Sequence, residues 1–92
     1  MNLNEIQSRM SKLNDWALES NLISKEFNFP SFKHGMEFIN KVAEIAEKHN
    51  HHPDIIISYS IVKLVLTTHH ERGLSEKDFD LAEEIDKIEI VK

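Results

Sequence analysis

One run of strand-forming residues, IIISYSIVKLVLTT at positions 55–68, most constrains how this chain can fold. Valine, isoleucine and threonine favour strands, but fourteen residues exceed the usual length of a single strand. The polar residues in the middle of the run, Ser58 to Ser60, therefore predict a turn between two antiparallel strands. In the second strand, alternation places Val62, Leu64 and Leu66 on one face. The opposite face carries Lys63, Val65, Thr67 and His69, so we expect His69 to lie away from the most apolar side.

Two longer segments have the apolar spacing of amphipathic helices. Pro30-Ser31 opens the first, and Pro53 ends it, because the residue before a proline is displaced from helical backbone angles. Ser75-Glu76-Lys77-Asp78 is a capping-box signature that opens the second. The predicted apolar stripes are Phe32, Met36, Ile39, Val42, Ala43 and Ala46 in the first helix, and Phe79, Ala82, Ile85 and Ile88 in the second.

The N-terminal third predicts a short helix followed by a hairpin. Leu3, Ile6, Met10 and Leu13 have helical spacing, and Asn2 or Asn4 can cap that helix. Residues 16–29 read as a hairpin with a first strand from Trp16 to Glu19 and a turn at Ser20-Asn21. Its second strand places Ile23, Phe27 and Phe29 on one face, which Lys25 interrupts.

The whole order is helix, β, β, helix, β, β, helix. It predicts a two-layer α+β fold, with a four-stranded antiparallel sheet that carries the helices on one face. At 92 residues, we expect a single domain over residues 1–92.

Composition excludes several classes of function. A formal net charge of −5 argues against a protein that binds the nucleic-acid backbone. The chain has no cysteine, so disulfides, thiolate zinc sites and cysteine nucleophiles are excluded, and any metal would need imidazole and carboxylate ligands. The N-terminus has no apolar signal core, and runs such as Ile55–Ile57 are too short to cross a bilayer. We therefore expect a cytoplasmic protein that contacts neither nucleic acid nor membrane directly.

Five of the six histidines gather in two groups, three of them in EKHNHHPD at 47–54 and two at positions 69 and 70. A metal site could use His49, His51, His52 and His69, although their spacing differs from the i, i+4 pair of zinc proteases. An acid–base site is equally compatible, because histidine both donates and accepts a proton near neutral pH. In that case Glu47 and Asp78 could orient or charge-balance the rings. Surface placement is the third reading, to which we assign His34 and His70.

The neighbouring residues also have structural readings that need no chemistry. Asp78 can cap its helix, and Glu47 can be a solvated helix residue. Asn50 can end the preceding helix, because asparagine tolerates the left-handed conformation. Trp16 and Tyr59 are expected to pack rather than to bind a ligand.

Taken together, these residues resemble the family of pterin-4a-carbinolamine dehydratases. The pattern comprises an acidic residue, His-His-Pro, an aromatic residue, Thr-His, Gly-Leu-Ser and an aspartate in the last helix. Here these are Glu47, His51-His52-Pro53, Tyr59, Thr68-His69, Gly73-Leu74-Ser75 and Asp78. Trp16 and the run Phe27-x-Phe29-x-x-Phe32 are similar as well, so the resemblance extends from about Leu13 to the C-terminus.

The resemblance implies a β-β-α-β-β-α fold and a reaction. These dehydratases remove water from 4a-hydroxytetrahydropterin to give quinonoid dihydropterin, which supports tetrahydropterin recycling, without a metal or organic cofactor. It assigns His51 and His69 as the acid–base pair and His52 as the residue that holds the pterin. Glu47, Trp16, Asp78 and Asn50 would contact or support the substrate.

The resemblance also implies partners and leaves a second function open. The family forms homodimers and homotetramers, and vertebrate relatives serve as dimerisation cofactors for a transcription factor. A non-catalytic module that binds a regulatory protein is therefore the alternative. Three positions depart from the family pattern and motivate it: Asn50 stands where many members carry aspartate, and Glu71 and Arg72 replace small residues.

Overall fold

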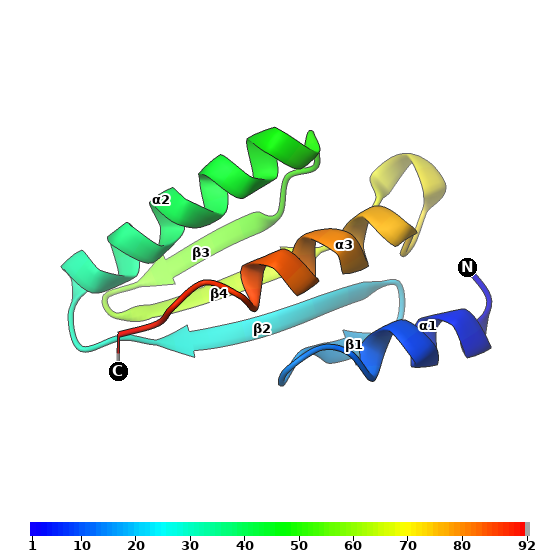
Figure 1. Ribbon diagram of the computed structural model, residues 1–92, viewed down its shortest axis with the longest axis horizontal. Coiled ribbons are helices and arrows are strands. Elements are labelled where there is room, and N and C mark those ends of the chain that lie inside the picture. Colours follow the sequence, from blue (N-terminus) through cyan, green and yellow to red (C-terminus); the bar gives the residue numbers. More distant parts are fainter. Residues whose placement is uncertain (92) are drawn as a thin grey trace.

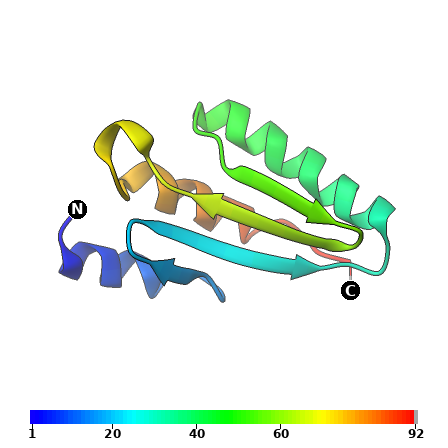
Figure 2. The ribbon, with the colours of Figure 1, turned by 180° about the vertical axis from the view of Figure 1, so that it is seen from behind.

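The computed structural model describes residues 1–91 of the chain (Figure 1). Two long helices, α2 and α3, lie on one face of a four-stranded sheet, and Figure 2 shows the sheet from its other face. The predicted two-layer α+β fold is confirmed. The elements are α1 (Leu3–Met10), β1 (Ala17–Glu19), β2 (Leu22–Asn28), α2 (Phe32–His49), β3 (Asp54–Ser58), β4 (Ile61–Leu66), the 3-10 turn η1 (His69–Glu71) and α3 (Glu76–Ile85).

The sheet has the strand order β1-β2-β4-β3, and every neighbouring pair is antiparallel. The long strand-forming run folds back on itself as predicted, with Ser58 paired to Ile61 across the turn. Tyr59 adopts a left-handed conformation in this turn, with φ of 53°. Its side chain is 75% exposed, so the expectation that Tyr59 packs is wrong within this chain.

The sheet face beneath the helices forms the core. Apolar residues on this face of β2 and β4 are almost completely buried, namely Ile23, Phe27, Val62, Leu64 and Leu66. Lys25 pairs with Leu64 on the same face, which is the interruption that the sequence contains. Its ammonium lies 3.0 Å from Asp86 Oδ1, so the charge is paired inside the protein.

β4 ends at Leu66, earlier than predicted, and this changes the setting of His69. Leu66 pairs with Ile23, near the start of β2, and the chain then leaves the sheet. Thr68 instead exchanges backbone hydrogen bonds with Gly73, with N–O distances of 3.0 and 3.3 Å. The predicted placement of His69 on a strand face is therefore wrong, because His69 begins the 3-10 turn η1 inside this closed loop.

The buried stripe of α2 differs from the predicted one. It consists of Gly35, Phe38, Val42 and Ala46, whereas Phe32 is 50% exposed and Ala43 is exposed. The reason is Gly35, which faces the sheet: a Cβ there would lie 3.4 Å from Ile57 Cδ1. The helix thus sits close to the sheet at a residue without a side chain, and Phe38 packs one turn further along.

α1 is attached to α3 by a cluster of charges. Arg9 pairs with Glu76, with Asp80 at 2.8 Å and with Glu83 at 2.9 Å. Burial opposes the charge of Arg9, but hydrogen bonds to Asp80 and Glu83 outweigh it and raise the pKa of the guanidinium above its ordinary value. Asn2 and Asn4 are the two predicted N-caps of α1. The observed N-cap is Asn2, which forms a capping box with Glu5.

Two predicted helix ends are too late. Leu13 lies beyond the end of α1, and Ile88 lies beyond the end of α3, although both pack against the core.

Within residues 1–91, no helix has the length and apolar character needed to cross a bilayer.

Candidate active site

The two histidine groups meet at one end of the molecule. The C-terminal end of α2, the loop before β3, η1 and the first turn of α3 come together there (Figure 1). Between them lies an open cavity of about 280 Å³, close to the lower end of volumes found for small-ligand pockets. Its lining comprises Asn50, His51, His52, Thr67, Thr68, His69, His70 and Lys77.

His51 is held by a buried carboxylate on α3. Its Nε2 lies 2.6 Å from Asp78 Oδ1, and the two side chains are 11% and 0% exposed. An ionised carboxylate only accepts hydrogen bonds, so Nε2 carries the proton in this pair. This fixes the neutral tautomer of His51 and leaves Nδ1 as the nitrogen that can accept a proton from a ligand.

The other oxygen of Asp78 is bound from within the protein. Thr68 Oγ1 donates to Asp78 Oδ2 at 2.8 Å, and the backbone N–H of Ser75 donates to the same oxygen at 3.0 Å. The second bond is the one that the capping-box signature predicts. Asp78 therefore caps α3, as one reading of the sequence expected, and supports His51 at the same time.

The other imidazoles of the cavity are more exposed. His52 Nε2 lies 2.5 Å from Glu47 Oε2, but these side chains are 58% and 76% exposed, so the pair adds little stability. His69 is exposed at the start of η1. His70 lies 3.7 Å from Glu71, too far for a direct hydrogen bond. The structure thus brings His51, His52, His69 and His70 to one cavity. Glu47 contacts His52, and Asp78 contacts His51.

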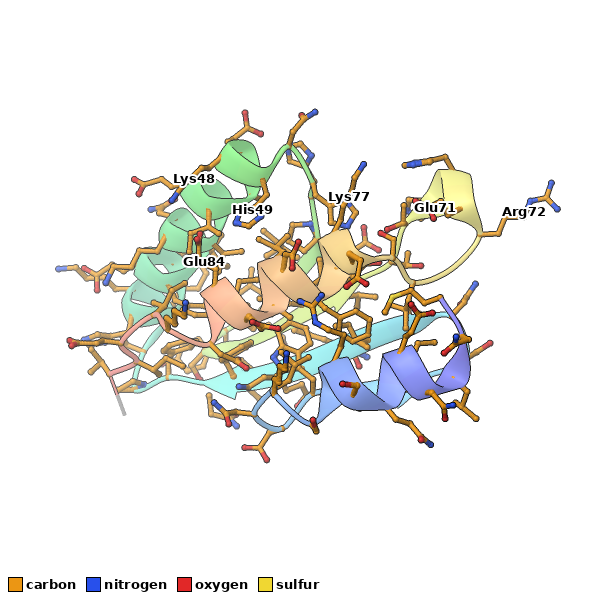
Figure 3. The ribbon with its side chains drawn as sticks, turned by 45° about the vertical axis from the view of Figure 1, so that its right-hand side comes forward. Lys48, His49, Glu71, Arg72, Lys77 and Glu84 are labelled. Atoms are coloured by element: carbon orange, nitrogen blue, oxygen red, sulfur yellow. The ribbon has the colours of Figure 1, made fainter. Side chains whose placement is uncertain are left out.

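The residues proposed for a metal site are not arranged as ligands. His49 faces α3, where its Nε2 lies 3.3 Å from Glu84 Oε2, and it does not line the cavity (Figure 3). Within residues 1–91, no group of three or more histidine, aspartate or glutamate side chains is placed to hold a metal ion. His34 also lies elsewhere, with Nδ1 2.7 Å from Ser31 Oγ at the start of α2.

The three unusual positions have different settings. Asn50 ends α2 in the left-handed conformation, with φ of 51° and ψ of 40°, as expected for a C-cap, and it lines the cavity. Arg72 is also left-handed, with φ of 56° and ψ of 33°, but its side chain points away from the molecule (Figure 3). Glu71 faces a neighbouring cavity with Ser75 and Glu76.

The sequence reasoning missed Lys77 as a residue of the cavity. Lys77 is exposed on the first turn of α3, between the loop after α2 and η1 (Figure 3). The sequence signal that could have indicated this placement is the position of Lys77 inside the Ser-x-x-Asp signature. That signature places residue 77 next to Asp78, at the helix end that carries the carboxylate.

Trp16 lies apart from the histidine cavity within one chain. Its ring is 7% exposed and packs edge-on against Phe27, with ring centroids 6.5 Å apart. Its Nε1 donates to Asp86 Oδ1 at 2.9 Å, at the opposite end of α3 from Asp78. The expectation that Trp16 packs is confirmed, and a contact with the substrate stays a prediction.

A larger cavity of about 590 Å³ lies along β2 and the C-terminal segment. Its lining includes Lys25, Phe27, Phe29 and Ile90 but no imidazole among the described residues. Acid–base chemistry therefore points to the smaller histidine cavity.

Comparisons with known proteins identify the family of the chain. Residues 1–88 match the sequence profile of a family described as pterin 4 alpha carbinolamine dehydratase. A protein of Sulfolobus acidocaldarius named "Putative pterin-4-alpha-carbinolamine dehydratase" is 43% identical over 86 residues, which cover 94% of each chain. A protein of Trichormus variabilis with the same name is 49% identical over 84 residues, which cover 91% of this chain and 90% of the relative.

Solved structures show the same fold. A crystal structure described as a transcriptional coactivator/pterin dehydratase from Brucella melitensis superposes with a TM-score of 0.86 and 29% identity, covering 92% of this chain and 93% of the other. A pterin dehydratase-like protein described as a RuBisCO assembly factor in the alpha-carboxysome shares the fold alone, with a TM-score of 0.67, 20% identity, and coverage of 82% and 89%. The chain belongs to the pterin 4 alpha carbinolamine dehydratase family.

Proposed function

We propose that this protein is a 4a-hydroxytetrahydrobiopterin dehydratase, which converts 4a-hydroxytetrahydropterin to quinonoid dihydropterin and water. The observation that carries the proposal is the buried pair of His51 and Asp78, whose imidazole lines one cavity together with His52 and His69 in a chain of this family. The pair supplies an imidazole of fixed tautomer, and a second imidazole lies on a separate loop. This arrangement suits a reaction that moves two protons and requires no redox change.

In the proposed mechanism, the bond between C4a and the hydroxyl oxygen breaks while a double bond forms between C4a and N5. His69 donates a proton to the departing hydroxyl, which leaves as water. His51 accepts the N5 proton at Nδ1, because Asp78 keeps the other nitrogen protonated and stabilises the imidazolium that forms. Proton exchange with solvent then restores both histidines. Each positioned transfer is worth about 10²–10⁴-fold in rate.

The remaining residues of the cavity would bind the pterin. We propose that His52 holds the ring, with Glu47 orienting His52 through their contact. Asn50 lines the same wall and can hydrogen-bond to the polar edge of the ring. The proposal includes no metal and no organic cofactor, because acid–base transfer to hydroxyl and from N5 accounts for the whole reaction.

The first test measures how fast freshly generated 4a-hydroxytetrahydropterin disappears, with and without the protein, and again with EDTA. We expect acceleration that EDTA leaves unchanged. His51→Ala and His69→Ala should each lower turnover by about 10²-fold or more while the protein stays folded. His49→Gln, outside the cavity, is the matched control and should retain turnover. A folded His51→Ala/His69→Ala double variant with undiminished turnover would refute the mechanism.

Self-association is part of the proposal. β3 is an edge strand, and exposed apolar residues lie on it and beside it: Ile56 on β3 is 53% exposed, Tyr59 in the turn 75%, and Ile61 at the start of β4 41%. An open apolar edge of this kind favours pairing with another strand. We propose a homodimer or homotetramer that uses this edge. Ile56→Lys should shift sedimentation toward the monomer, whereas a wild-type protein that sediments as a monomer would contradict it.

The alternative function is a non-catalytic module that uses the same fold to bind a regulatory protein. The description of the Brucella relative as a coactivator supports considering it. Two measurements together distinguish the two functions. If the wild-type protein does not accelerate loss of the carbinolamine, and a partner co-purifies equally with the His51→Ala/His69→Ala variant, the binding role is favoured.

A further inference from the structure

At the wall of the histidine cavity, which Thr68 helps to line, lies a short chain of buried hydroxyl groups that the proposed mechanism does not use. Thr68 is 1% exposed and Ser75 is 7% exposed, and their hydroxyl oxygens lie 2.7 Å apart. Thr68 stands at the point where the chain leaves β4, and Ser75 is the N-cap of α3. Buried hydroxyls are normally satisfied by hydrogen bonds, so the direction of each bond can be deduced.

The direction follows from the carboxylate. Three donors converge on Asp78: His51 Nε2 on one oxygen, and Thr68 Oγ1 with the Ser75 backbone N–H on the other. A carboxylate in this setting only accepts, so the single proton of the Thr68 hydroxyl is directed to Asp78. Thr68 must therefore accept from Ser75. The bonds run in one direction, from the Ser75 hydroxyl through Thr68 to the carboxylate, whose other oxygen binds His51.

We propose that Thr68 and Ser75 are positioning residues that act on His51 through Asp78. The hydroxyl chain fixes the rotation of the carboxylate and stabilises its charge where no water reaches it. A carboxylate held in this way keeps the Nε2–H of His51 in place and presents Nδ1 to the substrate. The inference rests on the proposed dehydratase activity, but its effect on the His51 hydrogen bond can be measured without that activity.

The deciding variant is Thr68→Val, which removes the hydroxyl while keeping the shape of the side chain. We expect kcat to fall about 10-fold because the histidine loses its fixed orientation. KM should stay within about two-fold, because Thr68 is 1% exposed and its hydroxyl donates to Asp78 rather than into the cavity. Thr68→Ser retains the hydroxyl and should restore kcat to within about two-fold of the wild type. Ser75→Ala removes only the outer bond, so its loss should be smaller, about three-fold.

The second readout is the exchange of the His51 Nε2–H proton with water, followed by NMR. We expect this proton to exchange about 10-fold faster in Thr68→Val than in the wild type or in Thr68→Ser. Ser24→Ala is the control, because Ser24 is a buried hydroxyl on β2 outside the cavity, and it should change neither measurement. Thermal unfolding of each variant shows that the comparison is made on folded protein.

Two outcomes would overturn the inference. One is a folded Thr68→Val protein with unchanged kcat and unchanged proton exchange. The other is Thr68→Ser being as impaired as Thr68→Val, which would assign the effect to packing at this position rather than to the hydroxyl. If the wild-type protein lacks dehydratase activity, the proposed function fails and kcat no longer tests the hydroxyl chain. The exchange of the His51 Nε2–H proton then decides: an unchanged rate in Thr68→Val would count against the hydroxyl chain.

Discussion

The indole N–H of Trp16 donates to Asp86 Oδ1 at 2.9 Å, joining the residue before β1 to the C-cap of α3. The same carboxylate accepts from the Asn14 backbone N–H and from Lys25, both at 3.0 Å. Asp86 thus connects the N-terminal hairpin by hydrogen bonds to the C-terminal end of α3, which is remote from the histidine cavity. Trp16 contributes to this attachment through a buried ring and one polar atom.

From this contact we predict that Trp16→Phe lowers stability rather than substrate affinity. The variant loses one hydrogen bond and part of a buried ring, which costs about 1–3 kcal/mol of unfolding free energy. Urea unfolding measures the loss, and KM for the pterin should stay within about two-fold. A large rise in KM with unchanged stability would instead place Trp16 in the substrate site, as the family resemblance implied.

Asp78→Asn should change the tautomer of His51. Thr68 and Ser75 both donate to one oxygen of Asp78, so the amide must direct its carbonyl toward them and its NH₂ toward His51. His51 must then accept at Nε2 and carry its proton on Nδ1, where the proposed mechanism needs an acceptor. We expect turnover to fall about 10²-fold or more. The ¹⁵N shifts of the ring report the tautomer, and an unchanged Nε2–H form would contradict this account.

Lys77→Met should weaken substrate binding more than it slows the reaction. The lysine ammonium is a donor at the rim of the cavity, and pterins present a carbonyl oxygen and ring nitrogens as acceptors. We expect KM to rise about three- to ten-fold, with kcat and stability little changed. Lys12→Met, on the exposed segment after α1, is the matched control for loss of one positive charge. Equal KM values for the two variants would exclude a role for Lys77 in binding.

Arg72→Gly should stabilise the protein, because a residue with a Cβ is strained in the left-handed conformation that Arg72 adopts. Its side chain points away from the molecule, so little contact is lost (Figure 3). We expect a gain of about 0.5–1 kcal/mol in unfolding free energy. Asn50→Gly tests the same geometry with a residue that tolerates it, and should change stability much less. A loss of stability in Arg72→Gly would reveal a contact of the arginine that this geometry does not predict.

The sequence was sufficient to predict the element order, because turn residues and apolar alternation are local properties. The turn near Tyr59 and the helix end before Pro53 are examples. It failed where tertiary contacts decide. Gly35 faces the sheet and shifts the buried stripe of α2, and the pairing of Thr68 with Gly73 draws His69 out of the strand.

The candidate site was predicted only in part for the same reason. The two histidine groups could be listed from the sequence, but no local pattern shows that Asp78 reaches His51 across 27 positions. The capping signature explains why an aspartate stands at the start of α3. It does not reveal that the other oxygen of that aspartate is free for an imidazole.

The double use of Asp78 has a consequence for how the protein unfolds and evolves. The carboxylate that begins the last helix is also the one that orients the proposed base, so fraying of the first turn of α3 and loss of a competent His51 are a single event. The proposed activity therefore reports the docking of α3. A lineage that abandons the chemistry still benefits from a capping side chain at this position, which allows the signature to outlive the reaction.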